Sequence, residues 1–300
     1  MEKDILDCII IGGGPAGLTA GIYLGRYRRK AVIYDAGNSR AEKIPLSHNY
    51  PGFPKGLSGP ELLARLQAQI AAYEVPIIPE PVDSIKQIDD YEFLVSTQTS
   101  ERFAKNIILA TGVKDIEPRL ADINDGIQKG LIRHCPVCDA FEVINKKIAV
   151  VGYGKSGLGE ALFLHDYTPN IYLLSLGKTD SWTKADLKKI REANITLITE
   201  DILKIELTSD SAKMIFTNQK KLEVDCLYSA LGAITNNKLA KDLGVKLKED
   251  AVLVNKHQQT SVKGVFATGD LVDGLNQICV ATSQAAIAAT AIHTHCREFK

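Results

Sequence analysis

The sequence has no excess of charge of either sign, because 36 basic and 36 acidic residues give a formal net charge of zero. Proteins that bind nucleic acid or anionic membranes usually carry a surplus of Lys and Arg. No apolar run approaches the roughly 20 residues that cross a bilayer. Met1 to Cys8 lack the basic start and apolar stretch of a secretory signal. We therefore expect a soluble, cytoplasmic protein with no nucleic-acid or membrane partner.

Clustered metal ligands are also scarce. Four of the six cysteines stand alone, at Cys8, Cys226, Cys279 and Cys296. Only Cys135 and Cys138 form a Cys-x-x-Cys pair, and a zinc site on such a pair usually needs a second one. No metal is therefore expected. In a reducing compartment, the pair indicates catalytic redox chemistry rather than a structural disulfide.

One β-α-β pattern occurs twice in the chain. The first copy spans residues 7–35, and the second begins at residue 146, about 140 residues later. Each copy has a buried apolar strand, a glycine-rich turn, an apolar helix and a second strand. A chain of 300 residues is longer than one core usually holds. The sequence therefore predicts an α/β protein with two Rossmann-like, three-layer nucleotide-binding domains.

The remaining segments carry weaker signals. Apolar runs predict single strands at 85–95 and 102–110. Asp, Asn and Gly residues at 115–130 indicate a linker, and the Ala-rich stretch 279–293 predicts a closing helix.

The first glycine-rich turn has the full pattern of a dinucleotide site. Gly12, Gly14 and Gly17 suit a tight turn, a close approach to pyrophosphate and close packing of helix on strand. The helix N-terminus then offers free N–H groups and a positive dipole to phosphate. Asp35 ends the second strand, where a carboxylate can bind a ribose diol. The turn therefore predicts a bound dinucleotide.

The second turn repeats the glycines of the first, but the residues after its second strand differ from those of a nucleotide site. Its candidate residues are Gly152, Gly154, Ser156 and Gly157. An NAD site has an acid at the end of the following strand, and an NADP site has arginines there. The strand at 171–174 is instead followed by Ser175, Leu176 and Gly177. The sequence leaves open whether a nicotinamide nucleotide binds here.

The dithiol has a chemically useful position. Pro136 follows Cys135 and suits the first turn of a helix, so Cys135 is expected at a helix N-terminus. The helix dipole there favours the thiolate, which is the attacking species in disulfide exchange. Asp139 is the first candidate for a proton carrier, ahead of His134.

These residues resemble low-molecular-weight thioredoxin reductases over nearly the whole chain. The matching stretches are Gly12 to Gly17, His48 to Gly52, Ala110 to Gly112, Cys135 to Asp139, Gly152 to Gly157, and Gly269-Asp270 with Gln277. The resemblance implies an FAD domain formed by residues 1–115 and 246–300. It also implies an inserted central domain, residues 116–245, which carries the dithiol, together with a homodimer and a large rotation between the domains.

The resemblance assigns roles to individual residues. Cys138 is expected to face the flavin, Cys135 to attack the partner disulfide and Asp139 to donate a proton. FAD is expected to bind at Gly12, Gly14, Pro15, Ala16, Gly17, Asp35, Asn49, Thr111, Gly112, Gly269, Asp270 and Gln277.

Two departures from the family affect the electron donor. The family's His-Arg-Arg stretch and later Arg correspond to Ser175, Leu176, Gly177 and Ser181. The second glycine turn has Lys155 and Gly157 where the family has Asp and Ala. NADPH is therefore left uncertain, and another donor such as ferredoxin is considered. An aromatic residue, Phe299, lies in the short tail and is a candidate cover for the flavin.

The leading hypothesis is an FAD-dependent disulfide reductase that passes electrons through Cys135 and Cys138 to a protein disulfide such as that of thioredoxin. Two alternatives remain open. One is a dithiol oxidase that passes electrons from a thiol substrate through flavin to oxygen. The other is a flavin-binding redox sensor without enzymatic turnover.

Overall fold

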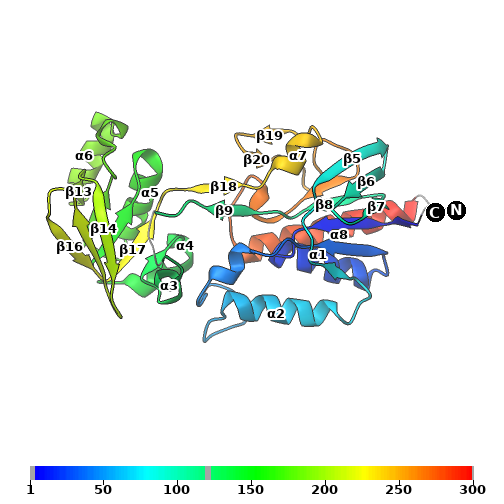
Figure 1. Cartoon of the computed structure of the whole chain (residues 1–300), viewed down its shortest axis with the longest axis horizontal. Coiled ribbons are helices and arrows are strands. Elements are labelled where there is room, and N and C mark those ends of the chain that lie inside the picture. Colours follow the sequence, from blue (N-terminus) through cyan, green and yellow to red (C-terminus); the bar gives the residue numbers. More distant parts are fainter. Residues whose placement is uncertain (1–3, 119–122, 299–300) are drawn as a thin grey trace. The chain divides into compact units, whose positions relative to one another are not determined.

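A computed structural model of the chain describes residues 4–118 and 123–298 (Figure 1). Phe299, the proposed flavin cover, lies outside these residues. The chain forms two compact units. The first contains residues 1–42, 59–114 and 235–300, and the second contains residues 43–58 and 115–234.

The first unit is built on a five-stranded parallel sheet with strand order β21-β8-β2-β3-β4. Every residue of β2, β3, β8 and β21 is buried, which explains the continuous apolar runs in the sequence. The bounds are β2 (Cys8–Ile11), β3 (Ala31–Tyr34), β4 (Ile77–Ile78), β8 (Ile107–Leu109) and β21 (Val265–Ala267).

Helices and an antiparallel sheet complete the layers of this unit. Helix α1 (Pro15–Arg26) packs against α2 (Gly59–Ile70) and α8 (Ile278–Glu298). The antiparallel strands are β5 (Ser84–Asp89), β6 (Glu92–Ser96) and β7 (Glu101–Ala104), and β1 (Ile5–Leu6) pairs in parallel with β7. One buried core joins this sheet to the parallel strands, through residues such as Phe93, Val95, Ile9 and Leu109. A short helix α7 (Lys238–Asp242) and the hairpin β19 (Leu247–Lys248) and β20 (Ala251–Val252) complete the unit.

The second unit repeats the plan. Its parallel sheet has the order β10-β17-β11-β12-β13, and its antiparallel sheet has the order β14-β15-β16. The parallel strands are β10 (Ile132–Arg133), β11 (Ile148–Val151), β12 (Ile171–Leu174), β13 (Thr196–Ile198) and β17 (Cys226–Ser229). The antiparallel strands are β14 (Ile202–Leu207), β15 (Ala212–Phe216) and β16 (Lys221–Val224), and the helices are α3 (Ile123–Gln128), α4 (Pro136–Asp139), α5 (Gly154–His165) and α6 (Lys184–Glu192).

Separate cores cover the two faces of this second parallel sheet. One core joins its strands to α5 and α6, and the other joins them to β14, β15 and β16. Where the chain passes between the units, β9 (Val113–Asp115) pairs with β18 (Ala233–Thr235). The predicted α/β class with two Rossmann-like three-layer units, the second inserted in the sequence of the first, is confirmed.

The structure corrects three local predictions. Residues 85–95 form the hairpin of β5 and β6 rather than one strand, because Tyr91 turns the chain with a left-handed φ of 58°. Residues 102–110 contain two strands, β7 and β8, in different sheets. The predicted linker 115–130 contains α3. The functional domain boundaries stay predictions, although residues 43–58 group with the second unit.

Two negative findings concern only residues 4–118 and 123–298. In that part of the chain, no helix has both the length and the apolar character needed to span a membrane. The same residues contain no group of three or more His, Cys, Asp or Glu side chains arranged to hold a metal ion.

Candidate active site

The dithiol is closed as a disulfide at the start of a very short helix. Cys135 and Cys138 are bonded, with their Cα atoms 5.2 Å apart. As the sequence predicts, the helix begins after Cys135, with Pro136 at its first position. The backbone N–H of Cys138 donates to the carbonyl of Cys135 at 2.9 Å. Both cysteines are half-buried, so the pair combines a fixed backbone with partial access to solvent.

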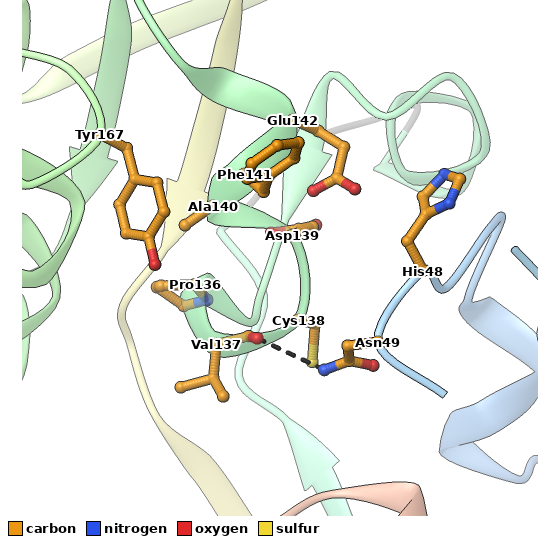
Figure 2. A pocket seen from close by; sticks show the side chains of 10 residues that line it. All are labelled: His48, Asn49, Pro136, Val137, Cys138, Asp139, Ala140, Phe141, Glu142 and Tyr167. Atoms are coloured by element: carbon orange, nitrogen blue, oxygen red, sulfur yellow. Dashed lines mark hydrogen bonds between the residues drawn. The ribbon is translucent and has the colours of Figure 1, made fainter. Parts of the chain in front are cut away.

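A pocket of about 240 Å³ within the second unit opens beside Cys138. It is lined by Cys138 and its neighbours, and Figure 2 shows them around the sulfur: His48, Asn49, Pro136, Val137, Asp139, Ala140, Phe141, Glu142 and Tyr167. The Nδ2 of Asn49 donates to the carbonyl of Val137 at 3.3 Å, which ties residues 43–58 to the helix that carries the disulfide. Cys138 thus shares a polar wall with two carboxylates and a histidine.

Asp139 is held from two sides. Its Oδ2 forms an ion pair with Nη1 of Arg133 at 2.9 Å, and its Oδ1 accepts from the hydroxyl of Tyr228 at 2.7 Å. The side chains of Arg133 and Asp139 are only 16% and 23% exposed. Burial raises the pKa of Asp139 above its ordinary value, while Arg133 and Tyr228 act in the opposite direction. The carboxyl group is therefore partly buried and well partnered.

Two neighbouring strands supply these partners. Arg133 on β10 and Tyr228 on β17 are directly paired in the parallel ladder. The Nε of Arg133 donates to the carbonyl of Gly130 at 3.1 Å, which anchors the guanidinium. Burial raises the pKa of Tyr228, and it raises the pKa of the nearby Cys226 to about 11. Cys226 is therefore a buried and unreactive thiol.

The sequence analysis missed both partners of Asp139. Arg133 is a charged residue between the apolar Ile132 and the dithiol, and Tyr228 is a hydroxyl-bearing residue in a fully buried strand. A polar group inside a buried strand usually has a partner. That signal existed, but the partner lies 89 positions away in the chain.

The first glycine turn has the geometry of a dinucleotide cradle. Gly12 has a φ of 112°, and a Cβ on it would overlap the carbonyl of Ala110. A Cβ on Gly17 would overlap the carbonyl of Gly12, so helix α1 can approach β2 only because both residues are glycines. Pro15 begins α1, with Ala16 buried behind it. Asp35 follows β3, and its Oδ1 accepts from the N–H of Gly37 at 3.1 Å.

The other FAD candidates of the first unit lie at the same edge of the sheet. Thr111 and Gly112 follow β8, and Gly269 and Asp270 follow β21, so their parallel strands end together with β2 and β3. Arg40 forms an ion pair with Asp270 at 3.0 Å and brings a cation to this edge. The buried hydroxyl of Thr268 has no hydrogen-bond partner among the described residues.

A dinucleotide therefore fits this edge of the first sheet. Gln277 stands directly before α8 in the same unit. Asn49, the remaining FAD candidate, lies in the second unit, which contains residues 43–58.

The second glycine turn keeps the fold of the cradle but not the charges of an NADP site. A Cβ on Gly157 would overlap the backbone of Gly152, and the hydroxyl of Ser156 donates to the carbonyl of Ala230 at 3.2 Å. After β12, Ser175 is fully buried, and Gly177 lies against the carboxylate of Asp201. Lys178 is the only cation at residues 175–181, and the acid beside Gly177 repels a phosphate. The strand end therefore lacks the arginines that usually hold the 2′-phosphate of NADPH.

Comparison with known proteins agrees with this arrangement. The family described as "Pyridine nucleotide-disulphide oxidoreductase" matches residues 6–285. A thioredoxin reductase of Borreliella burgdorferi is 31% identical and covers 90% of this chain and 86% of its own. One from Mycoplasma genitalium is 29% identical, over 90% and 88% of the two chains.

A solved structure extends the likeness to the fold. The thioredoxin reductase of Streptococcus pyogenes superposes with a TM-score of 0.91 and covers 99% of this chain and 100% of its own, at 24% identity. This likeness shows the shared fold. With the family match and the relatives, the chain therefore belongs to the thioredoxin reductase family of pyridine nucleotide-disulphide oxidoreductases.

Proposed function

We propose that this protein reduces a protein disulfide, most simply that of thioredoxin, with electrons that pass from FAD through Cys135 and Cys138. The observation that carries the proposal is the closed disulfide on a short helix, beside a pocket that contains a buried acid. FAD, when bound at the edge of the first sheet, supplies the electron pair. The relatives named thioredoxin reductases support thioredoxin as the substrate.

The cysteines and Asp139 divide the work. The electron pair breaks the bond between the two sulfurs and leaves two thiolates, of which one takes a proton from Asp139. The thiolate of Cys135 then attacks the partner disulfide, and a mixed disulfide forms as the partner's other sulfur leaves. Cys138 attacks Cys135 in that mixed disulfide, which releases the reduced partner and closes the pair again. Val137 and Phe141 are 50% and 74% exposed beside the pair, which suits a protein partner.

Single substitutions test this assignment. Cys135→Ser and Cys138→Ser are each expected to abolish catalytic reduction of thioredoxin disulfide, because each removes one sulfur of the pair. Cys279→Ser is the matched control, since Cys279 is a free and exposed cysteine. Reduction that persists in either active-site variant at the control rate would contradict the proposal.

The electron donor forms a second part of the proposal. The residues after β12 favour a donor other than NADPH, such as ferredoxin, because no arginine lies at 175–181. Anaerobic titration with NADPH, NADH and reduced ferredoxin, followed by bleaching of the flavin, identifies the donor. Full bleaching by one equivalent of NADPH would refute the preference.

The homodimer and the cytoplasmic location are also proposed, by likeness to the family.

The same strand end also favours a second candidate, a dithiol oxidase that uses oxygen, because an oxidase has no need of nicotinamide. Peroxide release on mixing the aerobic flavoprotein with small dithiols supports it, and no peroxide excludes it. A flavin redox sensor would show no turnover with any donor, together with a partner that binds only one redox state.

A further inference from the structure

The environment of Asp139 is built by residues outside the dithiol helix. Arg133 lies on β10 and Tyr228 on β17, and the two strands are hydrogen-bonded neighbours in the parallel sheet. Their side chains reach separate oxygens of the same carboxylate, at 2.9 Å and 2.7 Å. The hydroxyl of Tyr228 also lies 3.2 Å from the backbone carbonyl of Asp139. The carboxylate is therefore fixed in position and in orientation by the sheet.

We propose that Arg133 and Tyr228 are positioning residues of the disulfide reaction, which orient the carboxyl group of Asp139 beside Cys138 and set how tightly it holds its proton. This inference rests on the disulfide reduction proposed above. It extends that function to two side chains that do not line the pocket around Cys138.

These contacts matter at the moment when Asp139 gives up its proton. When an electron pair breaks the sulfur–sulfur bond, one thiolate takes the proton of Asp139, and Asp139 becomes a carboxylate. FAD bound to the first unit would supply that electron pair. Burial of a bare carboxylate is costly. A fixed guanidinium and a hydroxyl donor stabilise the charge that forms at this moment. Arg133 and Tyr228 therefore lower the cost of giving up the proton.

The structure holds the guanidinium ready for this role. The Nε of Arg133 donates to the carbonyl of Gly130, while its Nη1 forms the ion pair with Asp139. A lysine could supply the charge but not both contacts. The chain therefore offers a conservative variant that separates charge from geometry.

Other charged or titratable groups around Asp139 bear on the test. Glu142 on the following turn acts against its ionisation. Cys226 on β17 faces Arg133 and Tyr228, and Lys146 acts on Cys226. His48 and Tyr167 line the same pocket as Asp139. These groups are kept unchanged in every variant, so that a change in Asp139 is due to the two positioning residues.

The first experiment measures the carboxyl group directly. The protein is labelled with ¹³C at aspartate side-chain carboxyls, and the Asp139 signal is identified by its loss in Asp139→Asn. Arg133→Met is expected to raise the pKa of Asp139 by about one to three units. Tyr228→Phe, which loses one hydrogen bond to the charged form, is expected to raise it by about one unit. Arg133→Lys is expected to shift it less than Arg133→Met.

Matched controls use residues away from the pair. Arg65→Met breaks an arginine–carboxylate contact with Glu61 on α2, and Tyr172→Phe removes a hydroxyl from β12 in the same sheet as Tyr228. Both controls should leave the Asp139 signal unchanged. An unchanged Asp139 pKa in Tyr228→Phe and in either Arg133 variant, in protein with a native circular dichroism spectrum, overturns the inference.

The second experiment joins the pKa to the reaction. Protein fully reduced by dithionite is mixed anaerobically with an excess of thioredoxin disulfide over a range of pH. The first disulfide re-forms the Cys135–Cys138 bond, so the return of oxidised-flavin absorbance then reports the step in which the flavin electrons break that bond and Asp139 gives up its proton. Because Asp139 acts as an acid, a higher pKa should move the alkaline limit of the rate to higher pH by the same amount. An unmoved limit, despite a raised pKa, overturns the inference. A wild-type protein that reduces no disulfide at any pH refutes the proposed function instead.

Discussion

Two helical glycines give the sharpest test of the first dinucleotide turn, because the same substitution should act in opposite directions. Gly17 lies in the first turns of α1, and Gly159 lies in α5 of the second unit. A Cβ on Gly17 would overlap the carbonyl oxygen of Gly12, whereas a Cβ on Gly159 meets no atom within 4 Å. Neither glycine has a positive φ, so the comparison isolates the space around the Cβ.

The magnitudes follow from this difference. Alanine gains about 1 kcal/mol over glycine in an exposed helix interior, so Gly159→Ala should stabilise its unit. Overpacking against the main chain costs about 1–3 kcal/mol, and a backbone oxygen cannot move aside as a flexible side chain can. Gly17→Ala should therefore lose about 2 kcal/mol net, at the upper end of that range. It should also separate α1 from β2 and weaken FAD binding.

Thermal unfolding and flavin content measure both effects. For units of this size, 1 kcal/mol corresponds to about 2–4 °C in Tm. Gly159→Ala should raise the transition of the second unit by that amount, and Gly17→Ala should lower that of the first unit and reduce the FAD retained after gel filtration. A Gly17→Ala protein with full FAD content and a raised Tm would refute the reasoning on the cradle.

Three further predictions concern stability. Burial raises the pKa of Glu160 to about 7, so the folded protein binds this proton more tightly than the unfolded chain, and stability falls as pH rises from about 4.5 to 7. After discounting for partial exposure, Glu160→Gln should increase the free energy of unfolding by about 1–2 kcal/mol at pH 8 and not at pH 4. Equal gains at both pH values in urea titrations would contradict this. Thr183 caps α6 and forms a capping box with Asp186, so Thr183→Ala should cost about 1 kcal/mol, while an unchanged urea midpoint would exclude a stabilising cap. Phe93 is fully buried between the sheets of the first unit, so Phe93→Ala should lower the free energy of unfolding by about 3–5 kcal/mol, which calorimetry would show in the transition of that unit. A loss under 1 kcal/mol would mean that the surrounding side chains collapse into the cavity.

The sequence predicted the parts of the fold that depend on local pattern. Buried apolar runs located β2, β3, β11 and β12, and the two glycine turns located the starts of α1 and α5. The start of the dithiol helix followed from Pro136 alone. These features require only residues that are close in the chain.

Features that depend on distant contacts escaped prediction. Nothing near Asp139 indicates that Tyr228 supplies its hydrogen bond, because the two meet only after β17 takes its place between β10 and β11. The hairpin of β5 and β6 was missed because its turn, at Asp90 and Tyr91, contains neither glycine nor proline. Asn49 likewise groups with the second unit, where its Nδ2 donates to the carbonyl of Val137, 88 positions away.

The ladder pairing of Arg133 with Tyr228 constrains the strands more than the surface beside the disulfide. Exposed residues such as Phe141 can vary without loss of the contacts that hold Asp139. The strands beneath cannot, because a slip of one position would turn either side chain to the opposite face of the sheet. A shift of register between β10 and β17 would therefore disrupt both contacts of Asp139 at once, whereas a substitution on the exposed surface beside the disulfide would leave them in place.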